Sequence, residues 1–199
     1  MKIIEENIFV NVGSFGDSKQ FHEILNQIRV AISCVTWSST NEFIIRPERR
    51  GNGVVPIKEN FIRHLVDNNW RSEVRMSMAE GMNPGKIDLV RATDFGKFAV
   101  EWETGNISSS HRAMNKIAVG IIQGALIGGI LVLPVRNLSQ YLTDRIGNYE
   151  EFTPYLPLYK NLIIRSGVIG IIAIEHDKES MDSQLIPKGK DGNAKKDDL

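Results

Sequence analysis

Three acidic residues near the middle of the chain could share one catalytic site. Asp88 lies in one apolar stretch, and Glu101 and Glu103 flank Trp102 in the next one, within the motif EWET. Side chains alternate between the two faces of a β-strand, so Glu101 and Glu103 should point the same way. If the two stretches pair as a hairpin, Asp88 can lie beside Glu101. Three carboxylates on one patch repel one another unless a cation shares the site.

Ligands made only of oxygen atoms select a hard ion such as Mg²⁺ over zinc. A divalent ion held there can activate water and neutralise charge on a phosphate that is being hydrolysed. The alternative is that these acids are simply solvated on an edge strand, because this spacing also occurs by chance. The apolar neighbours Ile87 and Val100 favour a site, since unpaired carboxylates are costly on a partly buried sheet.

A second group of polar residues could read DNA bases. Directly after the acids, in GNISSSHR, Asn106 could bond to adenine, Ser108 to a base edge or a phosphate, and Arg112 to guanine. They lie at the start of a predicted helix, which itself favours phosphate. Asp144 and Arg145 are adjacent and could read both halves of one G·C pair. The alternatives are a serine N-cap with a solvated arginine, and a surface ion pair.

The elements that must position these residues follow an α/β order. We expect helices over residues 18–32, from Pro56 onward, 108–126, 137–146 and 149–161, and strands over 43–46, 86–92, 97–103, 130–135 and 168–176. The link TDFG predicts an antiparallel hairpin from residues 86–103. The strand–helix–strand order from Val100 to Val135 predicts parallel pairing in a mixed sheet. We expect one domain over residues 1–178 and a polar C-terminal tail over 179–199.

The overall composition is that of a globular protein. The chain has 199 residues, of which 42% are apolar and 24% charged, so wholesale disorder and coiled coil are excluded. Because 24 Lys and Arg balance 24 Asp and Glu, any nucleic-acid binding must depend on a local arrangement of basic residues. The candidates for phosphate contacts are Arg46, Arg49, Arg50, Lys58 and the lysines of the C-terminal tail. The acidic residues near the N-terminus argue against a signal peptide, so we expect a cytoplasmic protein.

One stretch also satisfies the length test for a membrane span. Residues 117–135 form a run of 19 residues in which Gln123 is the only polar side chain. The break at Gly128 and Gly129, together with Pro134, favours a helix that leads into a buried strand instead. We therefore expect no membrane partner.

Several segments resemble the BamHI family of type II restriction endonucleases, in the same order along the chain. The longest is VEWETGNISSSHRAMNK (100–116), and the others are NGVVPIKE (52–59), Asp88 in GKID, YLTDRIGNYEEFTPYL (141–156) and LIPKGKDG (185–192). The resemblance implies an α/β, restriction-endonuclease-like core with a mixed central β-sheet flanked by helices. It also implies a Mg²⁺-dependent homodimer that cleaves double-stranded DNA at the palindrome GGATCC, after the first G, leaving a 5′ overhang.

The resemblance assigns roles to individual residues. Asp88, Glu101, Glu103 and Glu73 would be catalytic, with the metal held by Asp88, Glu101, Glu73 and the backbone carbonyl of Trp102. Glu103 would be the general base or orient the attacking water. DNA would be read by Asn106, Ser108, Arg112, Asp144 and Arg145 in the major groove, and by Asp191 and Gly192 in the minor groove. The host would need a cognate DNA methyltransferase to protect its own genome.

At the dimer interface this sequence departs from the family pattern. Where the family carries ion-pairing residues, this chain has Ile122, Gln123, Pro157 and Lys160. A dimer here should therefore persist without those ion pairs. The rival hypothesis is a DNA-binding module that has lost cleavage, which would require one of the three central acids to be missing, and none is.

Overall fold

A six-stranded mixed sheet forms the centre of the protein. The computed structural model describes residues 1–37, 41–79, 81, 85–143 and 145–188. The strand order is β1-β7-β6-β5-β4-β3, with β5, β6 and β7 parallel and the outer strands antiparallel to their neighbours. The strands are β1 (Lys2–Val12), β3 (Arg71–Arg75), β4 (Lys86–Thr93), β5 (Gly96–Trp102), β6 (Gly128–Pro134) and β7 (Gly167–Glu175), and a small parallel sheet joins β2 (Ile44–Ile45) to β8 (Lys178–Glu179). The mixed α/β sheet was predicted.

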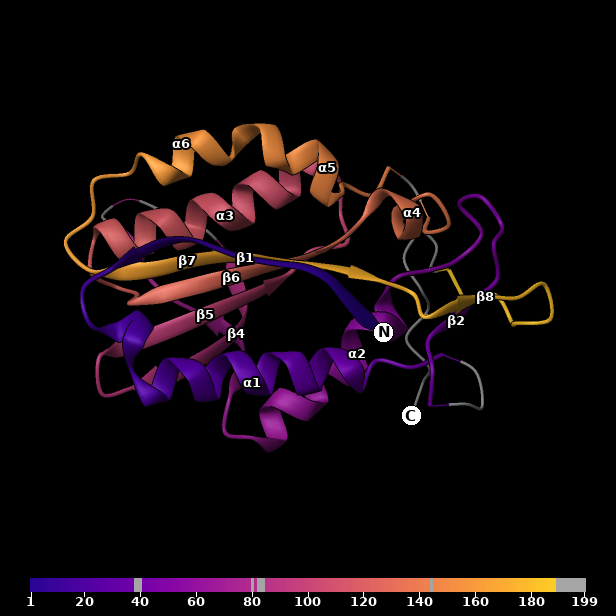
Figure 1. Cartoon of the computed structure of the whole chain (residues 1–199), viewed down its shortest axis with the longest axis horizontal. Helices are drawn as coiled ribbons and strands as arrows, with labels where there is room; N and C mark the ends of the chain where they lie inside the picture. The colour runs from indigo at the N-terminus through magenta and orange to yellow at the C-terminus, as the bar shows by residue number, and fades with distance from the viewer. Residues whose placement is uncertain (38–40, 80, 82–84, 144, 189–199) are drawn as a thin grey trace.

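Helices cover both faces of this sheet (Figure 1). On one face lie α1 (Lys19–Ser33) and α2 (Val55–Asp67), and on the other lie α3 (Ile107–Ile122), α5 (Tyr149–Phe152) and α6 (Leu156–Lys160). A short helix α4 (Arg136–Ser139) follows β6, and single 3₁₀ turns cover Phe15–Asp17 and Thr153–Tyr155. Each face has its own hydrophobic cluster. The result is a three-layer α/β/α fold, as expected.

The local sequence explains the main elements. Ser18 caps α1 by accepting a hydrogen bond from the amide of Phe21 at 3.2 Å, and Pro56 lies in the first turn of α2, where its missing N–H costs nothing. The apolar run 117–135 divides between α3 and the fully buried β6, with a turn at Gly124, whose φ is +73°. Within the described ranges, every helix is too short or too polar to cross a bilayer.

Two strands of the six-stranded sheet were not predicted, and both lie at its edges; β8 of the small sheet was not predicted either, because the polar tail was expected there. β1 carries Glu5 and Glu6 and is mostly half-exposed, and β3 reads RSEVR with four exposed residues. An edge strand buries few side chains, so its apolar alternation is weak in the sequence.

Three segments differ from the expected helices and tail. Among the described residues of the predicted helix 137–146, only 137–139 are helical, as part of α4, because Leu142 pairs with Asn52 in an isolated parallel bridge. The predicted helix 149–161 is divided into short turns at its two prolines. The residues after Asp177 were expected to be loose, yet Ile186 is buried in the core next to the candidate site.

Candidate active site

The hairpin of β4 and β5 brings Asp88 and Glu101 side by side. Leu89 pairs with Val100, so the next positions along the two strands, Asp88 and Glu101, lie level with each other. The amide of Asp88 donates to Glu101 Oε2 at 3.4 Å, and the amide of Trp102 donates to Asp88 Oδ2 at 2.9 Å. The predicted hairpin is therefore confirmed, and two of the three central acids are neighbours.

Glu101 is a buried carboxylate with a buried lysine as its partner. It is 5% exposed, and its Oε1 forms an ion pair with Nζ of Lys116 on α3. The same ammonium group donates to the carbonyl of Lys86 at 2.9 Å. Burial raises the pKa of Glu101 to about 7, the charge of Asp88 adds to the rise, and Lys116 opposes it.

Asp88 has its own lysine, which comes from the opposite face of the sheet. Nζ of Lys58 on α2 lies 2.6 Å from Asp88 Oδ1. Since α2 and α3 cover opposite faces (Figure 1), the two helices supply one ammonium group each to adjacent carboxylates. The pair of acids is thus stabilised by local positive charge, as neighbouring carboxylates on a buried sheet require.

Glu103 lies just past the end of β5, and its carboxylate is turned toward its own backbone. Its Oε1 accepts a hydrogen bond from the amide of Gly105 at 2.6 Å. Burial raises the pKa of Glu103, and the hydrogen bond from Gly105 opposes this rise. The charge of Asp88 raises the pKa further, whereas Lys58 and Arg112 lower it. Glu103 therefore lies within electrostatic reach of Asp88.

Glu73 lies level with Asp88 on the neighbouring strand β3, but its side chain pairs with a lysine. The pairs Ser72↔Leu89 and Val74↔Ile87 on either side put Glu73 level with Asp88. Glu73 has a φ of +54°, in the left-handed region, and its half-exposed carboxylate lies 3.0 Å from Lys86 Nζ. Glu73, Asp88 and Glu101 thus occupy one row across three adjacent strands.

The chemistry of this row fits a hard cation. The groups that it offers are carboxylate oxygens, and the buried Glu101 Oε1 already lies against one cation, the ammonium group of Lys116. In the part of the chain that the structure describes, no three His, Cys, Asp or Glu side chains converge as a preformed metal site. The carboxylates do not converge because that of Glu103 accepts a hydrogen bond from Gly105 and that of Glu73 pairs with Lys86.

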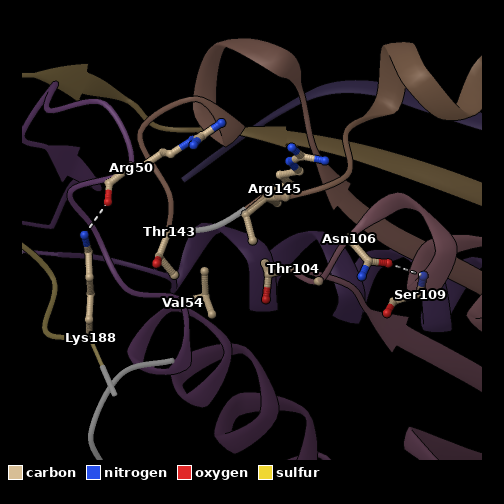
Figure 2. Close-up of a pocket in the computed structure, with 10 residues that line it drawn as sticks. Arg50, Val54, Thr104, Asn106, Ser109, Thr143, Arg145 and Lys188 are labelled. Carbon is tan, nitrogen blue, oxygen red and sulfur yellow. Dashed lines mark hydrogen bonds between the residues drawn. The ribbon is translucent and has the colours of Figure 1, made fainter. Parts of the chain in front are cut away.

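The predicted base readers at the start of α3 lie next to these acids. Asn106 is the N-cap of α3, and its Oδ1 accepts from the amide of Ser109 at 3.0 Å (Figure 2). The serines of GNISSSHR are therefore not the cap. Ser108 and Arg112 are both exposed on the first two turns, free to face a ligand.

The loop that carries Arg145 contacts the link between the acids and α3. The amide of Gly147 donates to the carbonyl of Gly105 at 2.8 Å. A Cβ atom on Gly147 would lie 2.8 Å from Cα of Ile107, so only glycine allows this approach. Arg145 is exposed, while Asp144, Asp191 and Gly192 lie outside the described residues.

A groove of about 720 Å³ joins these parts (Figure 2). Its lining brings together residues from four segments: Arg50, Val54, Thr104, Gly105, Asn106, Ser109, Thr143, Arg145, Ile146 and Lys188. Sequence reasoning did not single out Thr143 or Val54. Neither has a side chain that signals chemistry, and only the fold brings them to the groove.

The fold is that of the restriction endonucleases. Restriction endonuclease BglII in complex with a DNA 16-mer superposes with a TM-score of 0.61, at 12% identity over 89% of this chain and 79% of that chain. Free BglII gives a TM-score of 0.50, at 10% identity over 87% and 81%. At these identities the likeness concerns the fold alone.

Sequence comparison then gives the family. The family model for restriction endonuclease BamHI matches residues 1–193. The type II restriction enzyme OkrAI of Oceanobacter kriegii is 43% identical over 195 residues, which cover 98% of this chain and 99% of that protein. BamHI of Bacillus amyloliquefaciens is 34% identical over 189 residues, or 89% and 85% of the two chains. The chain belongs to the BamHI family of type II restriction endonucleases.

Proposed function

We propose that this endonuclease cleaves double-stranded DNA at the palindrome GGATCC, after the first G, in a reaction that requires Mg²⁺ and leaves a 5′ overhang. The observation that carries the proposal is the contact between the half-buried Asp88 and the buried Glu101, which lies beside the start of α3. Membership of the BamHI family and the fold shared with BglII, which was solved with DNA, support it.

The row of acids is the proposed metal site. Asp88, Glu101, Glu73 and the backbone carbonyl of Trp102 would hold the ion, which supplies positive charge near the scissile phosphate when bound. Lys58 and Lys116 hold the acids in place before then, since each forms an ion pair with one of them.

Glu103 is the proposed general base. Its raised pKa makes it a better proton acceptor than an ordinary glutamate, and the amide of Gly105 fixes one of its oxygens. It would take the proton from the attacking water while Asp88 and Glu101 stay with the cation. The charge on Arg112 also lowers the pKa of Glu103, so DNA contact at Arg112 would change the basicity of Glu103.

The groove is the proposed DNA surface. Asn106, Ser108, Arg112, Asp144 and Arg145 would read bases in the major groove, and Asp191 and Gly192 would reach the minor groove. Arg46, Arg49 and Arg50 would contact phosphates, so affinity for DNA should fall steeply with salt. A palindrome calls for two copies of the chain, one for each strand, and the host would protect its DNA with a methyltransferase.

Cleavage of defined duplexes tests the proposal. We would incubate the full chain with two duplexes, one that contains GGATCC and one in which a single base pair of this site is changed. Each duplex is tested separately in Mg²⁺, in Ca²⁺ and in EDTA. Sequencing of the fragment ends should give one cut per strand after the first G, with Mg²⁺ alone. Random cuts, or cuts at another sequence, would overturn the proposed specificity.

A variant series separates cleavage from binding. Glu103→Gln should slow cleavage by about 10²–10⁴-fold, the usual contribution of a general base, while binding of the duplex is kept. Glu59→Gln is the matched control, because Glu59 is an exposed glutamate next to Lys58. If wild type and Glu103→Gln both bind GGATCC without cutting it, the chain is the binding module instead.

A further inference from the structure

Asn52 is a fully buried polar residue outside the proposed catalytic site, and it joins three separate segments. It is 0% exposed, and it lies at the start of the motif NGVVPIKE, in which the proposed function uses Lys58 but gives Asn52 no role. The three segments are the basic loop 46–53, the loop residues 141–143 and 145–147, and the C-terminal segment 183–188. Each of them supplies residues to the groove in Figure 2.

The side-chain amide of Asn52 contacts all three segments at once. Its Nδ2 donates to the carbonyl of Arg46 at 3.0 Å and to the carbonyl of Tyr141 at 3.1 Å. Its Oδ1 accepts from the amide of Ile186 at 3.2 Å. Two donors and an acceptor on one short, uncharged side chain are properties that only asparagine combines at this length.

Backbone hydrogen bonds around Asn52 continue the same junction. Its amide donates to the carbonyl of Tyr141 at 3.0 Å, and its carbonyl accepts from the amide of Thr143 at 2.6 Å. The amide of Gly53 donates to the carbonyl of Ile186 at 2.8 Å. Since these segments meet here outside any named helix or strand, the junction sets how they lie relative to one another.

Each segment has a basic side chain within a few residues of the junction. Arg50 precedes Asn52 by two positions, Arg145 follows Thr143 by two, and Lys188 follows Ile186 by two. All three side chains are exposed and line the groove, and Lys188 Nζ donates to the carbonyl of Arg50. The cations therefore come from segments that are joined at one buried residue.

We propose that Asn52 is a positioning residue for DNA recognition, which fixes Arg145 relative to Arg50 and Lys188 so that base reading and phosphate contact occur together. Asn52 touches no DNA, because it is buried. This inference rests on the proposed role of Arg145 as a base reader. It predicts that a substitution of Asn52 weakens discrimination between DNA sequences more than it lowers the turnover rate.

Two substitutions in the full chain test the role of Asn52. Asn52→Asp keeps the shape but turns a donor into a charged acceptor that faces two carbonyls, and Asn52→Ala removes all three side-chain hydrogen bonds. The readout is the ratio of kcat/KM on GGATCC to kcat/KM on a duplex with one changed base pair. We expect this ratio to fall at least tenfold, with KM affected more than kcat.

A matched control separates a loss of protein stability from a loss of positioning. Ile28→Ala empties a fully buried site in α1, away from the groove, so it should lower thermal stability without changing the ratio once activity is normalised to folded protein. Amide hydrogen exchange gives a readout that does not need activity. In Asn52→Asp, the amides of Gly53, Thr143 and Ile186 should lose protection together, while those of β6 keep theirs.

The outcomes separate the inference from the proposed function. If wild type neither binds nor cuts GGATCC, the proposed function fails, whatever Asn52 does. If wild type is specific and both variants keep the ratio within twofold, the positioning role is overturned. If neither variant folds, amide hydrogen exchange of the wild-type protein tests the junction instead. Equal protection of the amides of Gly53, Thr143 and Ile186 supports one junction, and protection that differs tenfold or more contradicts it.

Discussion

The ammonium group of Lys116 and the carboxylate of Glu101 form an ion pair in which both side chains are more than nine-tenths buried. Removal of one partner leaves the other charge in a poorly solvated place, which typically costs about 3–5 kcal/mol. Lys116→Met should therefore destabilise the metal-free protein by up to that amount. The loss should be larger at about pH 9 than at about pH 6, because the pKa of Glu101, about 7 in the wild type, rises further without Lys116, and a group with a raised pKa loses stability as the pH rises. Thermal or urea unfolding measures the change.

A divalent cation should reverse part of this loss, because it would replace the missing positive charge beside Glu101. Mg²⁺ should raise the stability of Lys116→Met more than that of wild type. Lys19→Met is the control, since Lys19 is an exposed lysine on α1. Equal responses to Mg²⁺ in all three proteins would remove Glu101 from the proposed metal site.

Arg145→Ala tests the reading of bases. A bidentate contact from arginine to guanine contributes about 1–3 kcal/mol of discrimination, so specificity for GGATCC should fall about 10–100-fold. Competition binding between cognate and single-substituted duplexes measures it. Arg29→Ala is the control, because Arg29 is an exposed arginine on α1 that pairs with Glu6, away from the groove that Arg145 lines. Unchanged discrimination in Arg145→Ala would exclude this arginine as a reader.

The proposed dimer should depend on apolar contacts. Ile122 is 48% exposed and Ile163 is 96% exposed, and both line one groove of about 880 Å³. Burial of an isoleucine contributes about 1.5–3 kcal/mol, so Ile122→Lys should raise the dissociation constant of the dimer about 10–100-fold. Sedimentation velocity measures this, with Val30→Lys on α1 as control. Dissociation of the wild-type dimer in 1 M salt would indicate ion pairs instead.

His176 should make the stability of the protein depend on pH. Burial lowers its pKa from the usual value of about 6.5, although Glu175 and Glu179 oppose the shift and Lys2 adds to it. A histidine with a lowered pKa contributes stability above its unfolded pKa and loses it as the pH falls through its folded pKa. Acidification from pH 7 to pH 5 should therefore destabilise wild type more than His176→Gln. Unfolding curves across this range provide the comparison, and parallel curves would contradict the prediction.

Much of the central fold could be predicted because its elements bury strong apolar patterns. The stripe of α1, the hairpin of β4 and β5, and the buried β6 each follow from the sequence. The edge strands β1 and β3 could not be found, since partners in the sheet define them rather than their own side chains. The same holds for Leu142, where a bridge to Asn52 replaces the expected helix.

The candidate site could be predicted in part. The alternation of strand residues and the hairpin put Asp88 beside Glu101, as expected. The ion pairs that Lys58 and Lys116 form with these acids could not be predicted. The two lysines belong to helices on opposite faces of the sheet, and no local sequence pattern indicates how those helices pack. The junction at Asn52 depends on residues more than 80 positions apart, so only the folded chain reveals it.

The peptide units of Gly105 have a consequence for fidelity. The N–H of Gly105 is bonded to the carboxylate of Glu103, and its carbonyl accepts from Gly147, two residues beyond Arg145. If Arg145 is the base reader and Glu103 the general base, as proposed, a base pair that fits poorly against Arg145 would displace Gly105 and, through it, the carboxylate of Glu103. Recognition and proton transfer would then be coupled through a single glycine.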